Sequence, residues 1–134
     1  AAVDWCWTTA ETEFIFHLED DWELREKVNV PKVISTMRND SIKHVILRAY
    51  SYKYNKMALS PCIIHRDYYK RFSGDFDYSI NPEIQLRKPF VKKEEIIVAG
   101  KRPIVFDLGR TWLKTQPFKR PKVKGNFTAW ENTK

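Results

Sequence analysis

The sequence predicts an α/β domain with a mixed sheet and flanking helices. Short apolar runs of strand length alternate with segments that carry helix signals, which is the pattern of this class. The chain has 134 residues, of which 43% are hydrophobic and 14% aromatic, enough for one buried core and too many for a disordered chain. We expect one domain over residues 1–112 and a basic, extended C-terminal tail over residues 113–134.

Four helices are expected. Residues 1–13 favour a short helix with apolar positions along one side. Val30-Pro31 predicts a second helix start, because proline is favoured in the first turn, and residues 39–41 end that helix. Residues 67–72 form a third, short helix. Asn81-Pro82-Glu83 opens a fourth, with asparagine as the N-cap and proline in the first turn.

Five apolar runs have the length and composition of strands, and turn or loop residues separate them: residues 14–18, 44–49, 61–65, 96–99 and 104–108. The first run is expected as a buried, central strand. The last two are separated only by Gly100-Lys101-Arg102-Pro103, so we expect a hairpin there.

The first predicted strand ends in three consecutive acids, Glu19-Asp20-Asp21. Ligands of α/β sheets tend to bind beyond the carboxyl ends of strands. Mg²⁺ and Mn²⁺ prefer carboxylate oxygens and often share them with substrate phosphates. Three adjacent like charges repel one another, and a cation relieves that repulsion. The triplet therefore indicates a metal–diphosphate site, and the alternative is a solvated turn in which an aspartate caps the next helix.

Two stretches resemble nucleotide-sugar glycosyltransferases of the GT-A type, whose metal motif is Asp-x-Asp or a variant such as Glu-Asp-Asp. They are TEFIFHLEDDW and FSGDFDYSINPEIQLR, and the resemblance spans roughly residues 5–112. It implies a partial GT-A-like domain that transfers a sugar from a nucleotide-sugar donor to a hydroxyl of a sugar or lipid-linked acceptor. It also implies dependence on Mn²⁺ or Mg²⁺ and an inverting mechanism.

The resemblance further implies that this chain is the C-terminal part of such an enzyme. A GT-A domain carries a βαβ half for the nucleotide ahead of the metal motif, whereas here only residues 1–18 precede it. We therefore expect a fragment, which need not be active alone.

The same resemblance assigns roles to the acids of the triplet. In the family the last acid most often contacts the cation, and the first contacts ribose or a metal-bound water. Asp21 is therefore expected as the metal ligand, with Asp20 as a second ligand, and Glu19 and Asp20 as supporting contacts to the donor.

Glu83 is the expected general base. An inverting transfer needs a carboxylate that takes the proton from the acceptor hydroxyl. The family often has Glu-Asp where this chain has Pro82-Glu83. Glu83 could instead serve only the helix dipole, and Asp77 and Asp75 in the preceding loop are then the candidates.

Residues 107–112 form a third group of interest. Gly109 follows an apolar strand, where glycine permits a tight turn or a close approach of backbone to a ligand. Arg110 could clamp a diphosphate with two parallel hydrogen bonds. The alternative is an ordinary surface arginine.

The charge is uneven along the chain. Residues 1–90 hold 13 Lys and Arg against 13 Asp and Glu, whereas residues 91–134 hold 11 against 4, which accounts for the whole net charge of +7. The basic end could attract phosphate, anionic lipid headgroups or nucleic acid, or could be a solvated tail held by Trp112 and Trp130.

Two other functions stay open beside sugar transfer. One is a basic nucleic-acid-binding module, but no nucleic acid is expected as a partner, because the aromatic residues lie mainly in the neutral part of the chain. The other is a non-catalytic interaction domain with a transferase-like fold. The two cysteines are too few for a disulfide framework, and no run reaches the roughly 20 apolar residues of a transmembrane segment. We expect a cytoplasmic protein that its basic end could hold at a membrane surface.

Overall fold

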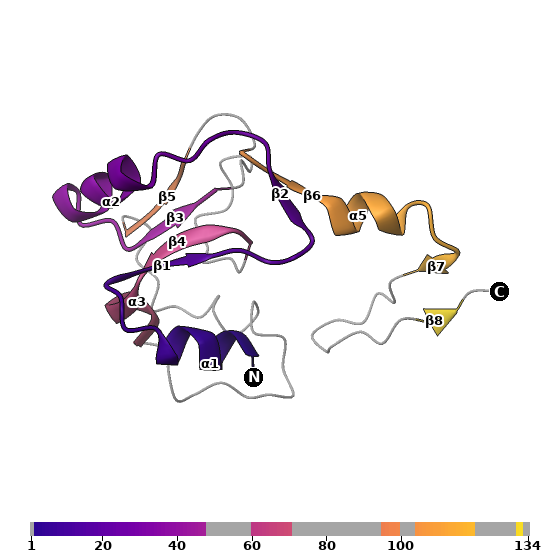
Figure 1. Ribbon diagram of the computed structural model, residues 1–134, viewed down its shortest axis with the longest axis horizontal. Coiled ribbons are helices and arrows are strands. Elements are labelled where there is room, and N and C mark those ends of the chain that lie inside the picture. Colours follow the sequence, from indigo (N-terminus) through magenta and orange to yellow (C-terminus); the bar gives the residue numbers. More distant parts are fainter. Residues whose placement is uncertain (1, 48–59, 71–94, 100–103, 120–130, 133–134) are drawn as a thin grey trace.

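The computed structural model describes residues 2–47, 60–70, 95–99, 104–119 and 131–132 (Figure 1), and it has the predicted mixture of helices and sheet. In chain order the elements are α1 (Ala2–Thr9), β1 (Phe14–His17), β2 (Trp22–Leu24), α2 (Val30–Asn39), β3 (His44–Ile46), β4 (Cys62–His65), α3 (Arg66–Lys70), β5 (Ile96–Val98), β6 (Val105–Asp107), α5 (Leu108–Leu113), β7 (Phe118–Lys119) and β8 (Glu131–Asn132).

The main sheet is mixed, as predicted. Its four strands lie in the order β1-β4-β3-β5. The β1–β4 and β4–β3 pairs are antiparallel, and the β3–β5 pair is parallel. Strands β1, β3 and β5 therefore run in the same direction, and their carboxyl ends lie at one edge of the sheet.

Helix α2 covers one face of this sheet. Met37 of α2 packs in a buried cluster with Val45 of β3 and Ile63 of β4, which are direct cross-strand partners. Val33, one helical turn before Met37, packs against the same cluster. This spacing places both side chains on one face of the helix.

The start and end of α2 agree with the sequence signals. The Asn29 side chain accepts a hydrogen bond from the Lys32 amide at 3.1 Å, and Pro31 lies in the first turn. At the other end, the Asp40 amide bonds the Thr36 carbonyl at 2.9 Å. Ser41 then adopts a φ of 55°, in the left-handed region, which takes the chain out of the helix.

Helix α1 lies against the opposite face of the sheet. Trp7 is buried, and its indole N–H donates to Nδ1 of His17 at 3.2 Å. The two rings meet edge to face, with centroids 5.3 Å apart. His17, Cys62 and Ile46 are register partners across three strands, so their side chains share this face of the sheet.

The prediction that residues 14–18 form a central strand is wrong in its placement. The strand exists, but β1 is the last strand of the four-stranded sheet within the described part of the chain. Phe16 shares a face with Ile63 and Val45, yet it stays partly exposed at this end of the sheet. An apolar run by itself does not reveal how much of the strand is covered, and that misled the prediction.

The predicted hairpin between residues 96–99 and 104–108 is also wrong. Strand β5 pairs with β3, and β6 pairs with β2 to form a separate two-stranded ladder. Ile96 is buried beside His44, while Phe106 points outward under the Arg25 guanidinium, 3.9 Å from the ring centroid. Burial of β5 against the main sheet outweighs the short connection between the two runs.

Beyond α5, the described residues contain a short ladder rather than only an extended tail. Phe118 and Lys119 of β7 pair with Asn132 and Glu131 of β8. Trp112, expected as an anchor, is 58% exposed on α5, and Trp130 lies outside the described residues. Figure 1 shows the β2–β6 ladder and α5 extending away from the main sheet. No helix within the described ranges is long and apolar enough to cross a membrane.

Candidate functional site

The acidic triplet forms a tight turn between β1 and β2. The Trp22 amide bonds the Glu19 carbonyl at 3.3 Å, which closes a four-residue turn. Asp20 and Asp21 are exposed, and Glu19 is half-buried. Since β1, β3 and β5 are codirectional, the turn leaves the sheet at the edge where the sequence predicted it.

Pairing of β2 with β6 brings this turn against the start of α5. Trp22 lies opposite Asp107 in the ladder. The Asp21 carbonyl then accepts hydrogen bonds from the amides of Leu108, at 2.8 Å, and Gly109, at 3.3 Å. Two groups of residues that the sequence marked separately, 19–21 and 107–112, therefore form one local structure.

Gly109 lies in close contact with Asp21. A Cβ atom built on Gly109 would lie 2.5 Å from Oδ2 and 3.1 Å from Cβ of Asp21. Real Cβ atoms do not come so close to other heavy atoms, so any larger residue would displace the Asp21 carboxylate. The group that lies close to this glycine is therefore an aspartate of the same chain.

Asp107 organises the first turn of α5. Its Oδ1 accepts the Arg110 amide at 2.7 Å, as an N-cap does, and its Oδ2 lies 3.2 Å from Nε of Arg110. The Asp107 side chain is only 16% exposed, whereas that of Arg110 is 64% exposed. The guanidinium is therefore held at one end by Asp107 and open to solvent at the other.

The arrangement offers carboxylate oxygens and a guanidinium to a ligand near the turn. A hard cation would take the oxygens of Asp21 and Asp20, and Arg110 would face an anionic group. Within the described ranges, no three His, Cys, Asp or Glu side chains gather closely enough to hold a metal ion. A cation bound at the turn would therefore need further oxygens from its substrate or from water, as Mg²⁺ often does.

The expected catalytic carboxylates are not placed. Glu83, Asp77 and Asp75 all lie outside the described residues. The site described above therefore concerns the expected donor side only.

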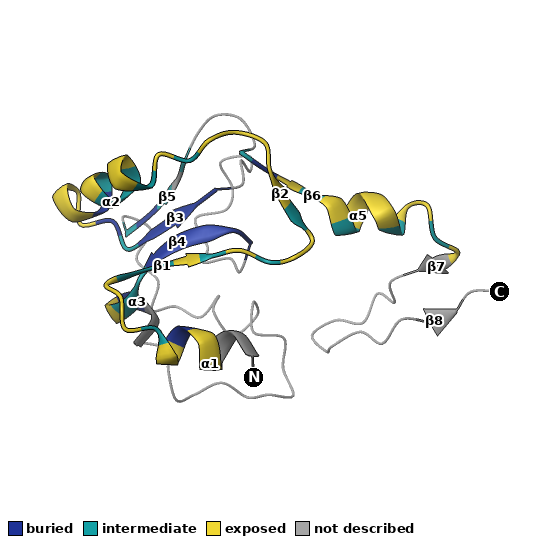
Figure 2. Cartoon of the chain, in the orientation of Figure 1, coloured by how far each residue is buried: buried dark blue, intermediate teal, exposed yellow. Residues whose placement is uncertain are grey.

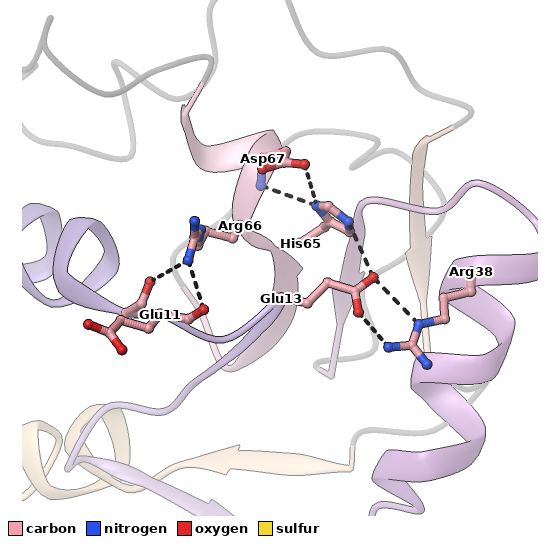
Figure 3. A network of polar contacts seen from close by, with 7 residues as sticks. Glu11, Glu13, Arg38, His65, Arg66 and Asp67 are labelled. Atoms are coloured by element: carbon pink, nitrogen blue, oxygen red, sulfur yellow. Dashed lines mark hydrogen bonds and ion pairs between the residues drawn. The ribbon is translucent and has the colours of Figure 1, made fainter.

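A second polar network, which sequence reasoning missed, lies at the opposite end of β1 (Figure 3). Glu13 is ion-paired with Arg38 of α2 and lies 3.7 Å from Nε2 of His65. Nδ1 of His65 accepts the Asp67 amide at 3.1 Å. The hydrogen bond to Arg38 lowers the pKa of Glu13, while burial, followed by the nearby Lys43, lowers the pKa of His65.

This network connects the residue before β1 with helix α2 and with the end of β4. Phe14 and His65 are register partners, so the residue before β1 meets the end of β4. Arg66 extends the network to the α1–β1 connection, where its guanidinium donates to the Glu11 carbonyl at 2.8 Å. Nδ1 of His65 therefore faces the Asp67 amide, and Nε2 faces the Glu13 carboxylate. The network depends on the antiparallel β1–β4 pairing, which the sequence did not reveal.

Two buried titratable groups lie in the main sheet, His44 in β3 and Cys62 in β4. Burial, with a smaller contribution from His17, lowers the pKa of His44 to about 3. Burial, aided by the nearby Glu19 carboxylate, raises the pKa of the Cys62 thiol. Both groups are therefore neutral at physiological pH, and the thiol is a poor nucleophile.

Comparison of the chain with protein-family models, with curated proteins and with solved structures found no significant match.

Proposed function

We propose that the chain is part of a glycosyltransferase that transfers a sugar from a nucleotide-sugar donor to an acceptor hydroxyl with Mn²⁺ or Mg²⁺. The single observation that carries the proposal is the contact between the acidic turn and the start of α5. It places Asp21 against Gly109, which precedes Arg110 in the chain, although Asp21 and Gly109 are far apart in the sequence. Asp21 and Arg110 together supply an oxygen ligand for a cation and a guanidinium for the diphosphate that the cation would share.

Each residue has a defined part in this proposal. Asp21 binds the cation, with Asp20 as a second ligand and Glu19 as a contact to the ribose or a metal-bound water. Arg110 exchanges its contact with Asp107 for a phosphate oxygen of the donor. Glu83 removes the proton from the acceptor hydroxyl as that oxygen attacks the anomeric carbon. Asp77 and Asp75 are the substitutes if Glu83 fails this role. We propose an inverting reaction and an acceptor that is a sugar or a lipid-linked sugar.

The test is thermal unfolding of the whole chain with Mn²⁺ together with UDP- or GDP-sugars. A ligand at one hundred times its Kd stabilises the native state by about 2.7 kcal/mol. We expect that stabilisation in the wild type and its loss in Asp21→Ala. The matched control is Asp40→Ala, because Asp40 is an exposed aspartate at the end of α2. If the ligands stabilise Asp21→Ala as much as Asp40→Ala, Asp21 is not part of the site.

Turnover tests the second half of the proposal, in an enzyme that includes a nucleotide-binding half. Glu83→Gln should keep donor binding and lower kcat by about 10²–10⁴-fold. A loss of only a few-fold in kcat would show that Glu83 serves the start of its helix and is not the general base. Stabilisation by oligonucleotides in place of nucleotide-sugars would favour the nucleic-acid-binding alternative, and stabilisation by neither would favour a non-catalytic interaction domain.

A further inference from the structure

His65 ends strand β4 and also occupies the N-cap position of helix α3. Figure 2 shows the buried strand leading directly into this helix. Nδ1 of His65 accepts a hydrogen bond from the amide of Asp67, the second residue of α3, at 3.1 Å (Figure 3). An N-cap side chain makes this bond, ordinarily through an oxygen atom. Here a titratable nitrogen makes it, and an imidazole nitrogen accepts a hydrogen bond only while it carries no proton.

The hydrogen bond also defines the form of the neutral ring. With Nδ1 as the acceptor, the ring proton is on Nε2, which lies 3.7 Å from the Glu13 carboxylate. The Phe14 ring meets the imidazole edge to face, with centroids 5.2 Å apart. The His65 side chain is only 14% exposed, so water solvates little of the ring.

Among the described residues, the charged groups around this ring oppose one another. Two carboxylates favour the protonated ring, namely Glu13 at Nε2 and Asp67, whose Oδ2 lies 3.9 Å from Nδ1. Two cations disfavour it, namely Arg38 of α2, which is paired with Glu13, and Lys43, which precedes β3. Burial of the ring, followed by the charge of Lys43, lowers the pKa of His65 from its ordinary value of 6.5. The neutral, capping form is therefore favoured in the folded protein.

We propose that His65 is a pH-sensitive cap, which holds the start of α3 while its ring is neutral and releases it when the ring is protonated. A proton from solvent on Nδ1 removes the acceptor of the Asp67 amide and sets one N–H against another. The new N–H then pairs with the Asp67 carboxylate, which lies close to the same nitrogen. This cap is independent of the proposed sugar transfer, because it uses none of the residues assigned to that reaction.

Release of the cap affects how α3 is held in the molecule. The helix has five residues, too few to persist without tertiary contacts and a cap. It carries Tyr68, which is fully buried, and Arg66, whose guanidinium donates to the Glu11 carbonyl in the α1–β1 connection. Protonation of the cap therefore loosens a helix that joins the end of β4 to the segment after α1.

The experiment is an NMR titration of the whole chain between about pH 8 and pH 5, the range in which a histidine of ordinary pKa changes its charge. The ring nitrogen shifts of His65 report its tautomer and its titration midpoint. The amide proton shift of Asp67 reports the hydrogen bond. His65→Asn is the principal variant, because asparagine is a good N-cap and does not titrate.

Two further variants test the surroundings of the ring. Glu13→Gln removes the carboxylate at Nε2 and leaves Arg38 without its partner. Glu23→Gln is the matched control, because Glu23 is also an exposed glutamate paired with an arginine, Arg25, but lies in the β2–β6 ladder.

We expect the neutral ring of His65 to carry its proton on Nε2 and to titrate below pH 6.5. The Asp67 amide should move with the same midpoint toward the shift of an unbonded amide. In His65→Asn this movement should be absent, because the cap stays in place. Glu13→Gln should lower the midpoint of His65 further, and Glu23→Gln should leave it unchanged.

Three results would overturn the proposal. The first is a neutral ring that carries its proton on Nδ1, because that ring cannot accept the Asp67 amide. The second is a midpoint at or above pH 6.5, which would show that the two carboxylates outweigh the capping bond. The third is an Asp67 amide that moves equally in His65→Asn, which would assign the movement to another titrating group. The wild-type titration alone decides the first two.

Discussion

His44 is the buried residue with the clearest effect on stability. It lies in β3 with no exposed surface, and among the described residues neither of its ring nitrogens has a hydrogen-bond partner. The folded protein therefore holds it neutral, with a pKa lowered from 6.5 to about 3 by burial and then by His17. A buried polar ring without partners lowers stability rather than adding to it.

We expect acid to destabilise the protein through His44. Between pH 6.5 and about 3 the unfolded chain binds a proton at His44 and the folded chain does not, so stability falls as pH falls through this range. The cost is up to about 1.4 kcal/mol for each pH unit. His44→Leu should therefore reduce the loss of stability between neutral pH and about pH 5, as measured by urea unfolding.

His65 acts in the same direction, because its pKa is also lowered, so some pH dependence will remain in the His44 variant. A wild-type pH dependence that persists undiminished in His44→Leu would show that His44 does not control it.

Gly109 offers a test of its contact with Asp21. In a helix, alanine is more stable than glycine by up to about 1 kcal/mol. At position 109, however, the alanine Cβ would lie 2.5 Å from Oδ2 of Asp21. We expect Gly109→Ala to be destabilising, or at best neutral, in the wild type. In an Asp21→Gly background the same substitution should become stabilising. Unfolding free energies of the four proteins give the coupling between the two residues, and additive effects would contradict the contact.

At the scale of the elements, helix α2 is stabilised by local interactions in its first turn and by packing on the sheet. Its first turn combines the Asn29 cap with Pro31, and its apolar face is anchored by Met37. The N-cap satisfies an amide that has no partner inside the helix. The cap sets the residue at which the helix begins, and packing on β3 and β4 stabilises the helix.

Loss of the cap should be measurable. We expect Asn29→Ala to lower the free energy of unfolding by about 1 kcal/mol and Asn29→Asp to retain most of it, because aspartate also accepts the Lys32 amide. The control is Asn39→Ala at the last, exposed position of α2, which should change stability by less than about 0.5 kcal/mol. Similar losses at both positions would argue against the cap.

At the scale of the whole molecule, stability is concentrated in the main sheet. Residues of β3 and β4 are buried on both faces, between α1 on one side and α2 on the other. The β2–β6 ladder and α5 carry several exposed apolar side chains instead, among them Leu24, Phe106 and Trp112. This contrast predicts that the two parts open with different free energies.

Amide hydrogen exchange would measure the difference. We expect the slowest exchange at Val45 and Ile63, which are paired at the centre of the sheet, and faster exchange at Gly109 and Thr115 near the ends of α5. Equal protection in the two parts would mean that the molecule opens as one cooperative unit.

Local signals in the sequence located α2 and the strands of the main sheet, but they did not reveal β2 or α5. Val30-Pro31 and the residues around Ser41 bounded α2, and apolar runs located β1, β3, β4, β5 and β6 within a few residues. These signals act over a few residues of chain, through capping, turn chemistry and side-chain period, so they can be read without knowing the fold.

Only the tertiary structure decided which elements meet. The sequence could not show that β5 joins β3, that β6 joins β2, or that β1 ends the described sheet. The period of a strand tells which residues share a face, but its neighbour is chosen by burial among residues distant in sequence. For the same reason the acidic triplet could be marked as a candidate from sequence, whereas its contact with Gly109 follows from the β2–β6 pairing alone.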